Sequence, residues 1–145
     1  KDRVDDAILS TKAALEEGIV PGGGVALIHA KNMITERDSS LSKDKIRGIE
    51  IVESACESPF RAIVENAGLS ADTLLDRLNN APRESALNSR IGYNVVTEEF
   101  TDLITAGVVD PTKVTRTAIE KAVSVAGTLL TTEAMVVFEP DTDKS

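Results

Sequence analysis

The sequence predicts a mainly α-helical protein, a multi-helix bundle with short peripheral β segments. Apolar residues recur at helical spacing over most of the 145 residues. Only 3% of the residues are aromatic and Trp is absent, so the core must come from Ala, Val, Ile and Leu, which favours close helix packing over a β-sandwich. Hydrophobic residues amount to 41%, and a chain of this length buries about 68–70% of its unfolded surface, so we expect one domain's worth of core.

The first third of the chain is predicted to hold two helices joined by a glycine-rich turn. The first helix starts with the chain and stops at Gly18, a residue type that commonly ends helices. Ile19-Val20-Pro21 breaks the helical pattern and leads into Gly22-Gly23-Gly24. A second helix is expected from Val25 to about Glu36, and Asp38-Ser39-Ser40 is expected to form a loop.

The middle of the chain continues the helical pattern and then loses it. A third helix is predicted to end near Pro59, with the periodicity resuming beyond it until Gly68. Ser70 is a predicted cap of a short leucine-rich helix. The polar stretch from Asn79 to Arg90 is expected to be the least structured part of the interior. Ile91–Val96 has the composition of a short strand.

The last third is predicted to contain a brief helix around Glu98–Thr105 and then a long helix. Asp110-Pro111 predicts the start of the long helix, with Asp110 as N-cap and Pro111 at the first helical position. Met135–Phe138 is predicted to be a strand, and residues 140–145 a disordered tail. The strand segments have no obvious partner within the chain, so we expect them to pair with another chain or with a segment missing from this sequence. Small residues one turn apart on the long helix should let a neighbouring helix approach closely: Ala118, Ala122 and Ala126.

Charge and residue counts exclude several kinds of site. With 24 acidic and 16 basic residues the net charge is −8, which disfavours a nucleic-acid or membrane surface. Cys56 is the single cysteine and His29 the single histidine, which excludes an internal disulfide, a cysteine metal site and a histidine cluster. We expect His29 to be a partly exposed helix residue. No membrane span or signal peptide is visible, and the first residue, Lys1, already lies in a helical pattern, so we expect a piece of a longer chain.

Gly22-Gly23-Gly24 before a helix is a candidate nucleotide contact. Glycine lets backbone approach a ligand closely, and a helix N-terminus offers free N–H groups. No Lys-Ser/Thr pair follows, so the segment is not a Walker A loop. The triplet taken by itself is more simply a connector between two helices.

Asp6 and Asp110 are candidate carboxylates for a metal-nucleotide site. A carboxylate can orient a water as general base or accept a hydrogen bond from a ribose hydroxyl. Each also has a plainer explanation, since Asp6 fits a solvated helix face and Asp110 fits a simple N-cap.

Several ungapped blocks follow one another in the order found in GroEL-type (group I) chaperonins, and the chain resembles this family from Arg3 to about Val137. The blocks that carry the resemblance are Arg3–Ala7, Ala13–Leu27, Gly92–Asn94, Val109–Arg116, Ala126-Gly127 and Thr131–Val136. The resemblance implies that residues 1–17 are an intermediate-domain helix and residues 18–139 the C-terminal half of an equatorial ATP-binding domain.

The resemblance also implies residue roles and a cofactor. Asp6 would be the catalytic aspartate that positions the water attacking the γ-phosphate. ATP with Mg²⁺ would be the cofactor, and K⁺ is a further candidate. The Mg²⁺ ligand would lie mainly in the absent N-terminal half, and no metal ligand is expected in this chain. The residues implied to bind the nucleotide are Gly22, Gly23, Ile63, Tyr93, Asn94, Val95, Val96, Val108 and Asp110.

The implied function is ATP-dependent protein folding by a homo-oligomeric ring. Co-chaperonin and unfolded clients would bind through an apical domain absent from this chain. The expected compartment is the bacterial cytoplasm, or alternatively the mitochondrial matrix or plastid. We expect the isolated chain to be inactive, because the phosphate-binding loop of the family is absent too. Val95-Val96 departs from the smaller alanines common at those positions.

Two other functions are compatible with the residues. The chain could be a small all-α interaction module without a nucleotide, in which the acidic faces only solubilise. It could also be a stand-alone enzyme that uses Asp6 and Asp110 on a small phosphorylated substrate, although no Lys, His or Cys constellation supports this.

Overall fold

The predicted mainly helical fold is confirmed by the computed structural model, which describes residues 2–34, 40–80 and 88–136. Its helices are α1 (Asp2–Glu17), α2 (Val25–Met33), α3 (Lys43–Asn66), α4 (Ala71–Asn79) and α5 (Thr112–Leu130), with a 3₁₀ turn at Asn88–Arg90. Its strands are β1 (Ile19–Pro21), β2 (Ile91–Asn94), β3 (Glu99–Asp102) and β4 (Val109–Pro111). None of the helices in these ranges is long and apolar enough to cross a membrane.

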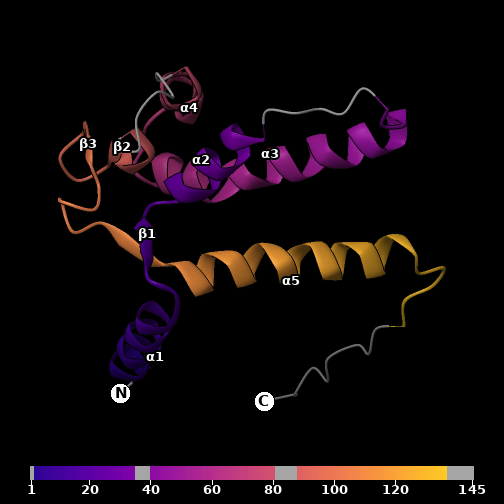
Figure 1. The fold of residues 1–145 in the computed structure, drawn as a ribbon, viewed down its shortest axis with the longest axis horizontal. Coiled ribbons are helices and arrows are strands. Elements are labelled where there is room, and N and C mark those ends of the chain that lie inside the picture. Colours follow the sequence, from indigo (N-terminus) through magenta and orange to yellow (C-terminus); the bar gives the residue numbers. More distant parts are fainter. Residues whose placement is uncertain (1, 35–39, 81–87, 137–145) are drawn as a thin grey trace, which may run out of the picture.

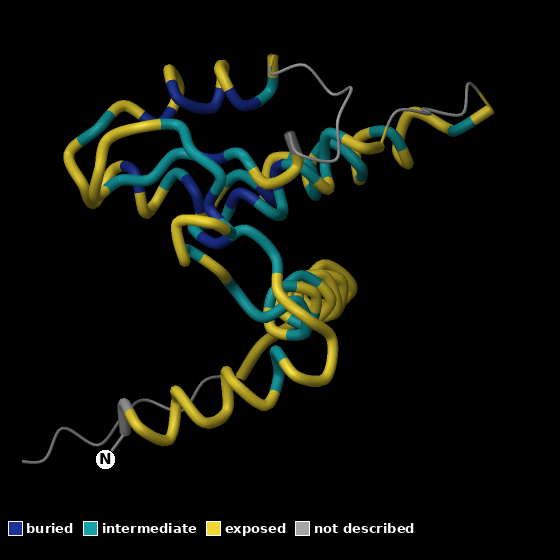
Figure 2. Tube along the Cα trace, turned by 60° about the vertical axis from the view of Figure 1, so that its left-hand side comes forward, coloured by how far each residue is buried: buried dark blue, intermediate teal, exposed yellow. Residues whose placement is uncertain are grey.

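The elements form a packed upper part and two projecting helices. Helices α2, α3 and α4 lie together with the β2–β3 hairpin (Figure 1). Helix α5 runs beside the long α3 with a space between the two ribbons, and α1 projects from the other end of β1. Burial follows this division, because the dark-blue buried segments belong to the packed part while α1 and α5 are mostly yellow (Figure 2).

The core lies where α2, the second half of α3 and α4 meet the hairpin. Val25 and Ile28 of α2 are fully buried, since neither exposes any of its surface. Cys56, Phe60 and Val64 recur every four residues and form the buried face of α3. The other buried hydrophobic residues of the described chain are Ala71, Leu74, Leu75 and Leu78 of α4, and Leu103. The core is therefore aliphatic apart from Phe60 and Cys56, as the composition predicts.

The prediction that the third helix ends near Pro59 is wrong, because α3 continues through it to Asn66. Proline lacks an N–H, so the carbonyl four residues earlier, that of Ala55, loses its helical partner. Both Pro59 and Ala55 are exposed, so water can satisfy that carbonyl. The helix is held on either side by the buried Cys56 and Phe60. Burial of one face thus outweighs the local cost of the proline.

The prediction of a brief helix around Glu98–Thr105 is also wrong, because β3 occupies Glu99–Asp102. It pairs antiparallel with β2, with Ile91 opposite Asp102 and Asn94 opposite Glu99. The rings of Tyr93 and Phe100 pack edge to face at 5.2 Å, which favours the strand over a helix. The predicted strand at residues 91–96 is present over Ile91–Asn94 and, contrary to expectation, has its partner within the chain.

A second small sheet joins the glycine turn to the start of α5. Ile19-Val20-Pro21, expected only to break a helix, forms β1 and pairs antiparallel with β4. Asp110 lies in β4 opposite Val20, so its predicted role as an N-cap is wrong. Pro111 is the N-cap, and Thr112 donates its backbone N–H to the carbonyl of Gly18 at 3.1 Å. Asp110 and Pro111, which the Asp-Pro pattern predicted to start the helix, therefore belong to a strand.

The other predicted boundaries are partly testable. Gly18 follows the end of α1 with φ 80, and Ser70 is the N-cap of α4, both as predicted. Helix α2 ends at Met33.

Met135 and Val136 are not in a strand, whereas Val137 and Phe138 lie outside the described residues. The predicted loop at 38–40, the polar stretch at 79–90 and the tail at 140–145 lie wholly or largely outside them as well. The alanines of α5 are exposed in the structure: Ala118, Ala122 and Ala126.

Candidate functional site

The glycine turn before α2 is fixed against its surroundings by close backbone contacts. Gly23 and Gly24 have backbone φ values of 68 and 76, which residues with a side chain rarely adopt. A Cβ on Gly24 would lie 2.6 Å from the backbone nitrogen of Phe60, so only glycine lets α2 approach α3 this closely. Gly24 is the N-cap of α2 and supplies no side-chain cap. The turn therefore leaves the first N–H groups of α2 free of a capping side chain.

The same turn is hydrogen-bonded to the segment that leads into β4. Gly22 donates its N–H to the carbonyl of Val108 at 2.9 Å. Val108 is partly buried and packs against the core, and β4 begins at the next residue. The structure thus brings together three of the predicted site residues, namely Gly22, Val108 and, two residues further on, Asp110.

Asp110 is half-buried beside this turn. Burial raises the pKa of its carboxyl above the ordinary value, because removing the charged form from water costs free energy. Within the described residues the carboxylate has no hydrogen-bonding or ion-pair partner. A half-buried carboxylate of this kind can accept hydrogen bonds from a ligand's hydroxyl groups.

The predicted residues of the β2–β3 hairpin lie next to the core but differ in exposure. Tyr93 and Val95 are partly buried and pack against the core. The Asn94 side-chain oxygen accepts a hydrogen bond from the Val96 backbone N–H at 3.0 Å, while the Val96 side chain is 87% exposed. Ile63 of α3 is 38% exposed, three residues after the Phe60 that Gly24 contacts.

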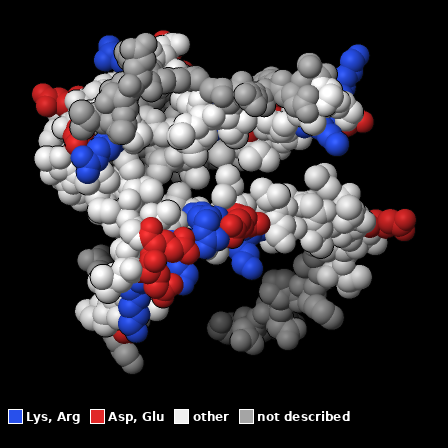
Figure 3. Space-filling model, in the orientation of Figure 1, with Lys and Arg blue, Asp and Glu red and all other residues white. Residues whose placement is uncertain are grey.

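Asp6 is not brought to this group of residues. It is exposed on α1, which lies apart from α2, α3 and α4 (Figure 1). The last turn of α1 is instead tied to the first turns of α5. Lys113 pairs with Glu16, and Arg116 pairs with Glu17 at 2.7 Å. Figure 3 shows charged side chains of both signs gathered where the two helices meet. In the described part of the chain, no cluster of His, Cys, Asp and Glu could hold a metal ion.

Comparison with known proteins places the chain in a family. The sequence profile of the TCP-1/cpn60 chaperonin family matches residues 1–140. The chain belongs to this family. A crystal structure of a group III chaperonin in the open state is similar over 86% of the chain, with a TM-score of 0.74 and 31% sequence identity. The chain spans 25% of the length of that chaperonin chain. The chaperonin resemblance is therefore confirmed at the level of the family, and the GroEL-type group stays a prediction.

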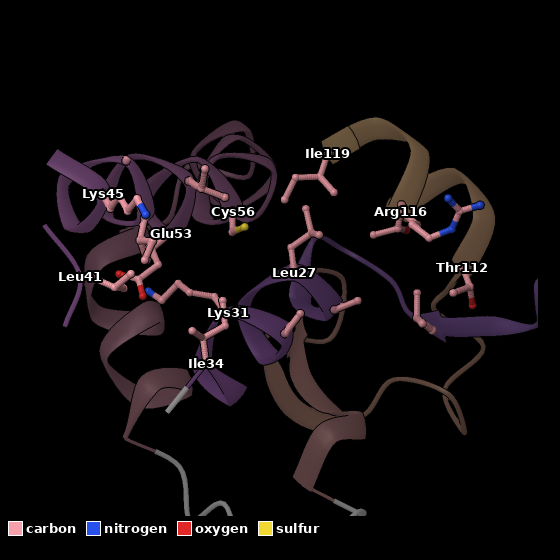
Figure 4. A pocket seen from close by; sticks show the side chains of 17 residues that line it. Leu27, Lys31, Ile34, Leu41, Lys45, Glu53, Cys56, Thr112, Arg116 and Ile119 are labelled. Carbon is pink, nitrogen blue, oxygen red and sulfur yellow. The ribbon is translucent and has the colours of Figure 1, made fainter. Parts of the chain in front are cut away.

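This chaperonin chain also has an apolar groove that the sequence analysis did not predict. The groove has a volume of about 800 Å³ and lies between α2, α3 and α5 (Figure 4). Leu27 of α2 and Ile34, the C-cap that follows α2, point into it, and Ile119 of α5 lines the opposite side. Lys31, Lys45 and Arg116 are among the few charged residues around it. The signal was present in the sequence as apolar periodicity on three helices, but periodicity does not tell which faces meet.

An ionic network that starts at Lys31 on the edge of the groove was likewise missed, and its centre, Lys31 and Glu57, is mostly buried. Lys31 of α2 donates to Glu57 of α3 at 2.5 Å, and Arg61 donates to the same carboxylate and to Asp72 in the first turn of α4. Burial would raise the pKa of Glu57, but the hydrogen bonds from Lys31 and Arg61 outweigh it and hold that pKa below its ordinary value. The network connects the three helices of the packed part of this chaperonin chain.

Proposed function

We propose that the chain is the C-terminal part of a GroEL-type (group I) chaperonin subunit. Residues 1–17 belong to the intermediate domain and residues 18–139 to the C-terminal half of the equatorial domain. The subunit assembles into a homo-oligomeric ring and uses ATP with Mg²⁺ to fold proteins. Family membership supports this proposal, together with the order of the blocks that carry the resemblance, such as Ala13–Leu27 and Val109–Arg116.

The observation that carries the nucleotide role is the hydrogen bond between Gly22 and Val108. It lies directly beside the last pair of the β1–β4 sheet and so joins the glycine turn to the strand of Asp110. The turn and the N-terminus of α2 would contact phosphate groups with backbone N–H, since a helix N-terminus favours anions. Asp110 would accept a hydrogen bond from a ribose hydroxyl, which would give its half-buried carboxylate a partner. Tyr93, Asn94, Val95 and Val96 would lie around the adenine, with Ile63 and Val108.

Asp6 would act as the residue that orients the attacking water. It lies on the far side of Gly18 from the glycine turn, and Gly18 has a positive φ that suits a hinge. A movement of α1 at this hinge would bring the carboxylate to the γ-phosphate, so that turnover depends on domain closure. Phosphoryl transfer depends mainly on positioning and electrostatics, so one misplaced carboxylate stops it. The Mg²⁺ ligand and the remaining phosphate contacts come from the other half of the domain, and K⁺ is a further candidate cofactor.

The groove between α2, α3 and α5 would receive the other half of the equatorial domain. The chain covers a quarter of a related chaperonin, so most of such a subunit lies outside it. Beyond the groove, large apolar residues of α5 are also about half exposed or more, including Val125 at 58% and Leu129 at 51%. A surface of this kind is costly to leave in water. The isolated chain would therefore lack both half of the nucleotide site and a cover for this face, and we expect it to be inactive.

The partners follow from the same assignment. Co-chaperonin and unfolded clients would bind an apical domain that is not part of this chain. Neither nucleic acid nor a membrane is expected as a partner, because the net charge is −8. We expect the subunit to work in the bacterial cytoplasm, or alternatively in the mitochondrial matrix or plastid.

The test is the replacement Asp6→Ala in the full-length subunit. The matched control is Asp5→Ala, which removes the neighbouring exposed carboxylate of the same helix. Asp6→Ala should bind Mg-ATP as the wild type does and lose turnover by at least about a hundredfold, while Asp5→Ala keeps it. Equal turnover in all three proteins would refute the catalytic role of Asp6.

A further inference from the structure

His29 makes a contact that neither its solitary occurrence nor its helical position predicts. Its Nε2 lies 2.9 Å from the backbone oxygen of Ile91, 62 residues further along the chain. A carbonyl oxygen only accepts hydrogen bonds, so Nε2 must carry the hydrogen. The side chain is half-buried, between α2 and the first residue of β2. His29 thus connects the helix that follows the glycine turn to the strand that carries Tyr93 and Asn94.

This bond closes a ring of hydrogen bonds that starts in the glycine turn before α2 and ends at His29 within α2. Gly22 donates to Val108, Val108 donates to the Leu103 carbonyl at 2.8 Å, and Leu103 donates to the Arg90 carbonyl at 3.0 Å. Arg90 is the residue before Ile91, whose carbonyl accepts from His29. Three of these four bonds join backbone atoms and no substitution of a side chain removes them directly. The fourth comes from the imidazole of His29.

The inside of the ring is packed without room for adjustment. A Cβ on Gly92 would lie 2.5 Å from a Leu103 methyl group and 2.8 Å from a Val25 methyl group. Val25 and Leu103 are both fully buried. Gly92 therefore lets β2 lie directly on the first residue of α2. The ring and this contact together set the distance from the glycine turn to Tyr93 and Asn94.

We propose that His29 is a positioning residue of the nucleotide site. Its hydrogen bond to Ile91 holds β2, and with it the base-binding residues Tyr93 and Asn94, at a fixed place relative to the glycine turn that binds phosphate. This inference depends on the proposed nucleotide function. It adds a side chain that touches no part of the nucleotide but determines how the base and phosphate halves of the site line up. Loss of the bond should weaken the hold on the base more than the hold on the phosphates.

The experiment compares two ligands on variants of the full-length subunit. His29→Leu removes the donor, and His29→Gln keeps a side-chain N–H that can reach the same carbonyl. The control Asn32→Leu breaks another half-buried bond of α2, the one from Asn32 to the Asn79 side-chain oxygen at 3.1 Å. Calorimetry measures Mg-ATP and inorganic tripolyphosphate, which lacks the base and the ribose. If His29→Leu does not fold, His29→Asn replaces it, because its side chain is too short for the bond.

His29→Leu should weaken Mg-ATP binding about fivefold, the effect of one lost hydrogen bond, and leave tripolyphosphate binding within about twofold. His29→Gln should restore the ATP affinity, and Asn32→Leu should not lower it. Unchanged ATP affinity in His29→Leu, equal weakening of both ligands, or no rescue by His29→Gln would overturn the inference while leaving the proposed function intact. A wild-type subunit that binds neither ligand would overturn both.

Discussion

Gly22 and Val108 are joined by a 2.9 Å backbone hydrogen bond, and a Cβ on Gly22 would lie 3.1 Å from the Val108 carbonyl carbon. The glycine turn and the start of β4 thus form one unit, although 86 residues separate them in sequence. The pairing of Val20 with Asp110 extends this unit and places the half-buried carboxylate beside the turn. The close approach favours glycine at position 22, because a Cβ there would push the Val108 backbone away by a few tenths of an ångström.

Gly24→Ala should destabilise the packed part of the chain by about 2 kcal/mol or more. The new Cβ would lie 2.6 Å from the Phe60 backbone, and the backbone of residue 24 has φ 76. Neither problem can be relieved by rotating a side chain. Urea unfolding of the purified chain, followed by circular dichroism, measures the loss.

The matched control for this change is Gly48→Ala. Gly48 lies inside α3, and a Cβ there meets no atom within 4 Å. Alanine is the better helix former, so this variant should gain about 0.5–1 kcal/mol. If both alanine variants lose stability equally, the close packing of α2 on α3 is not the cause.

Glu57→Gln should cost about 1–3 kcal/mol of unfolding free energy at pH 7, because it removes the negative charge that accepts three hydrogen bonds from the cations Lys31 and Arg61. In the folded chain the pKa of Glu57 is held below its ordinary value of 4.5. The ionised Glu57 carboxylate therefore stabilises the fold above pH 4.5, and this stabilisation is lost as the pH falls through the folded-state pKa. The difference between variant and wild type should therefore shrink below about pH 4.5. Urea unfolding at pH 7 and in this acidic range measures it.

Glu65→Gln is the control for Glu57→Gln, since Glu65 is an exposed carboxylate on the same helix. It should change stability by less than about 0.5 kcal/mol at either pH. A pH-independent loss in Glu57→Gln would mean that packing, and not the charge of the network, holds α2, α3 and α4 together.

Arg116→Gln should loosen α1 from α5. Arg116 donates to Glu17 at 2.7 Å and 3.1 Å and also pairs with Glu120. The hydrogen bond from Arg116 holds the pKa of Glu17 below its ordinary value of 4.5, so the attachment should also weaken as the pH falls through the folded-state pKa. Hydrogen exchange in the full-length subunit should become faster over α1 in the variant at pH 7. The control Lys121→Gln changes an exposed residue further along α5 and should leave hydrogen exchange over α1 unaltered.

Much of the fold follows from the sequence because its signals are local. Apolar spacing predicted the helices, Gly18 marked the end of α1, and Ser70 marked the start of α4. The misses have one common cause, which is tertiary contact overriding a local rule. Buried Cys56 and Phe60 carry α3 through Pro59, and the contact of Phe60 with Gly24 could not be read from either residue alone.

The candidate site was predictable as a list of residues and not as an arrangement. The resemblance to chaperonins supplied Gly22, Val108 and Asp110, and the structure places these three together. The Asp-Pro pattern predicted a helix cap for Asp110, because no local signal reveals that residues 19–21 pair with residues 109–111. His29 carried no signal at all, since its partner is a backbone carbonyl 62 residues away.

The most direct test is calorimetry of Mg-ATP binding to the full-length subunit, wild type and Asp110→Ala. Loss of the carboxylate should weaken binding by at least about tenfold, because it removes a charge-assisted hydrogen bond to the ribose. Burial raises the pKa of Asp110, so its charged form opposes folding, and Asp110→Ala should unfold at the same or a higher temperature at pH 7. Weaker binding by an equally stable variant is the result that the account predicts. Equal binding by both proteins, or no binding by the wild type, would contradict it.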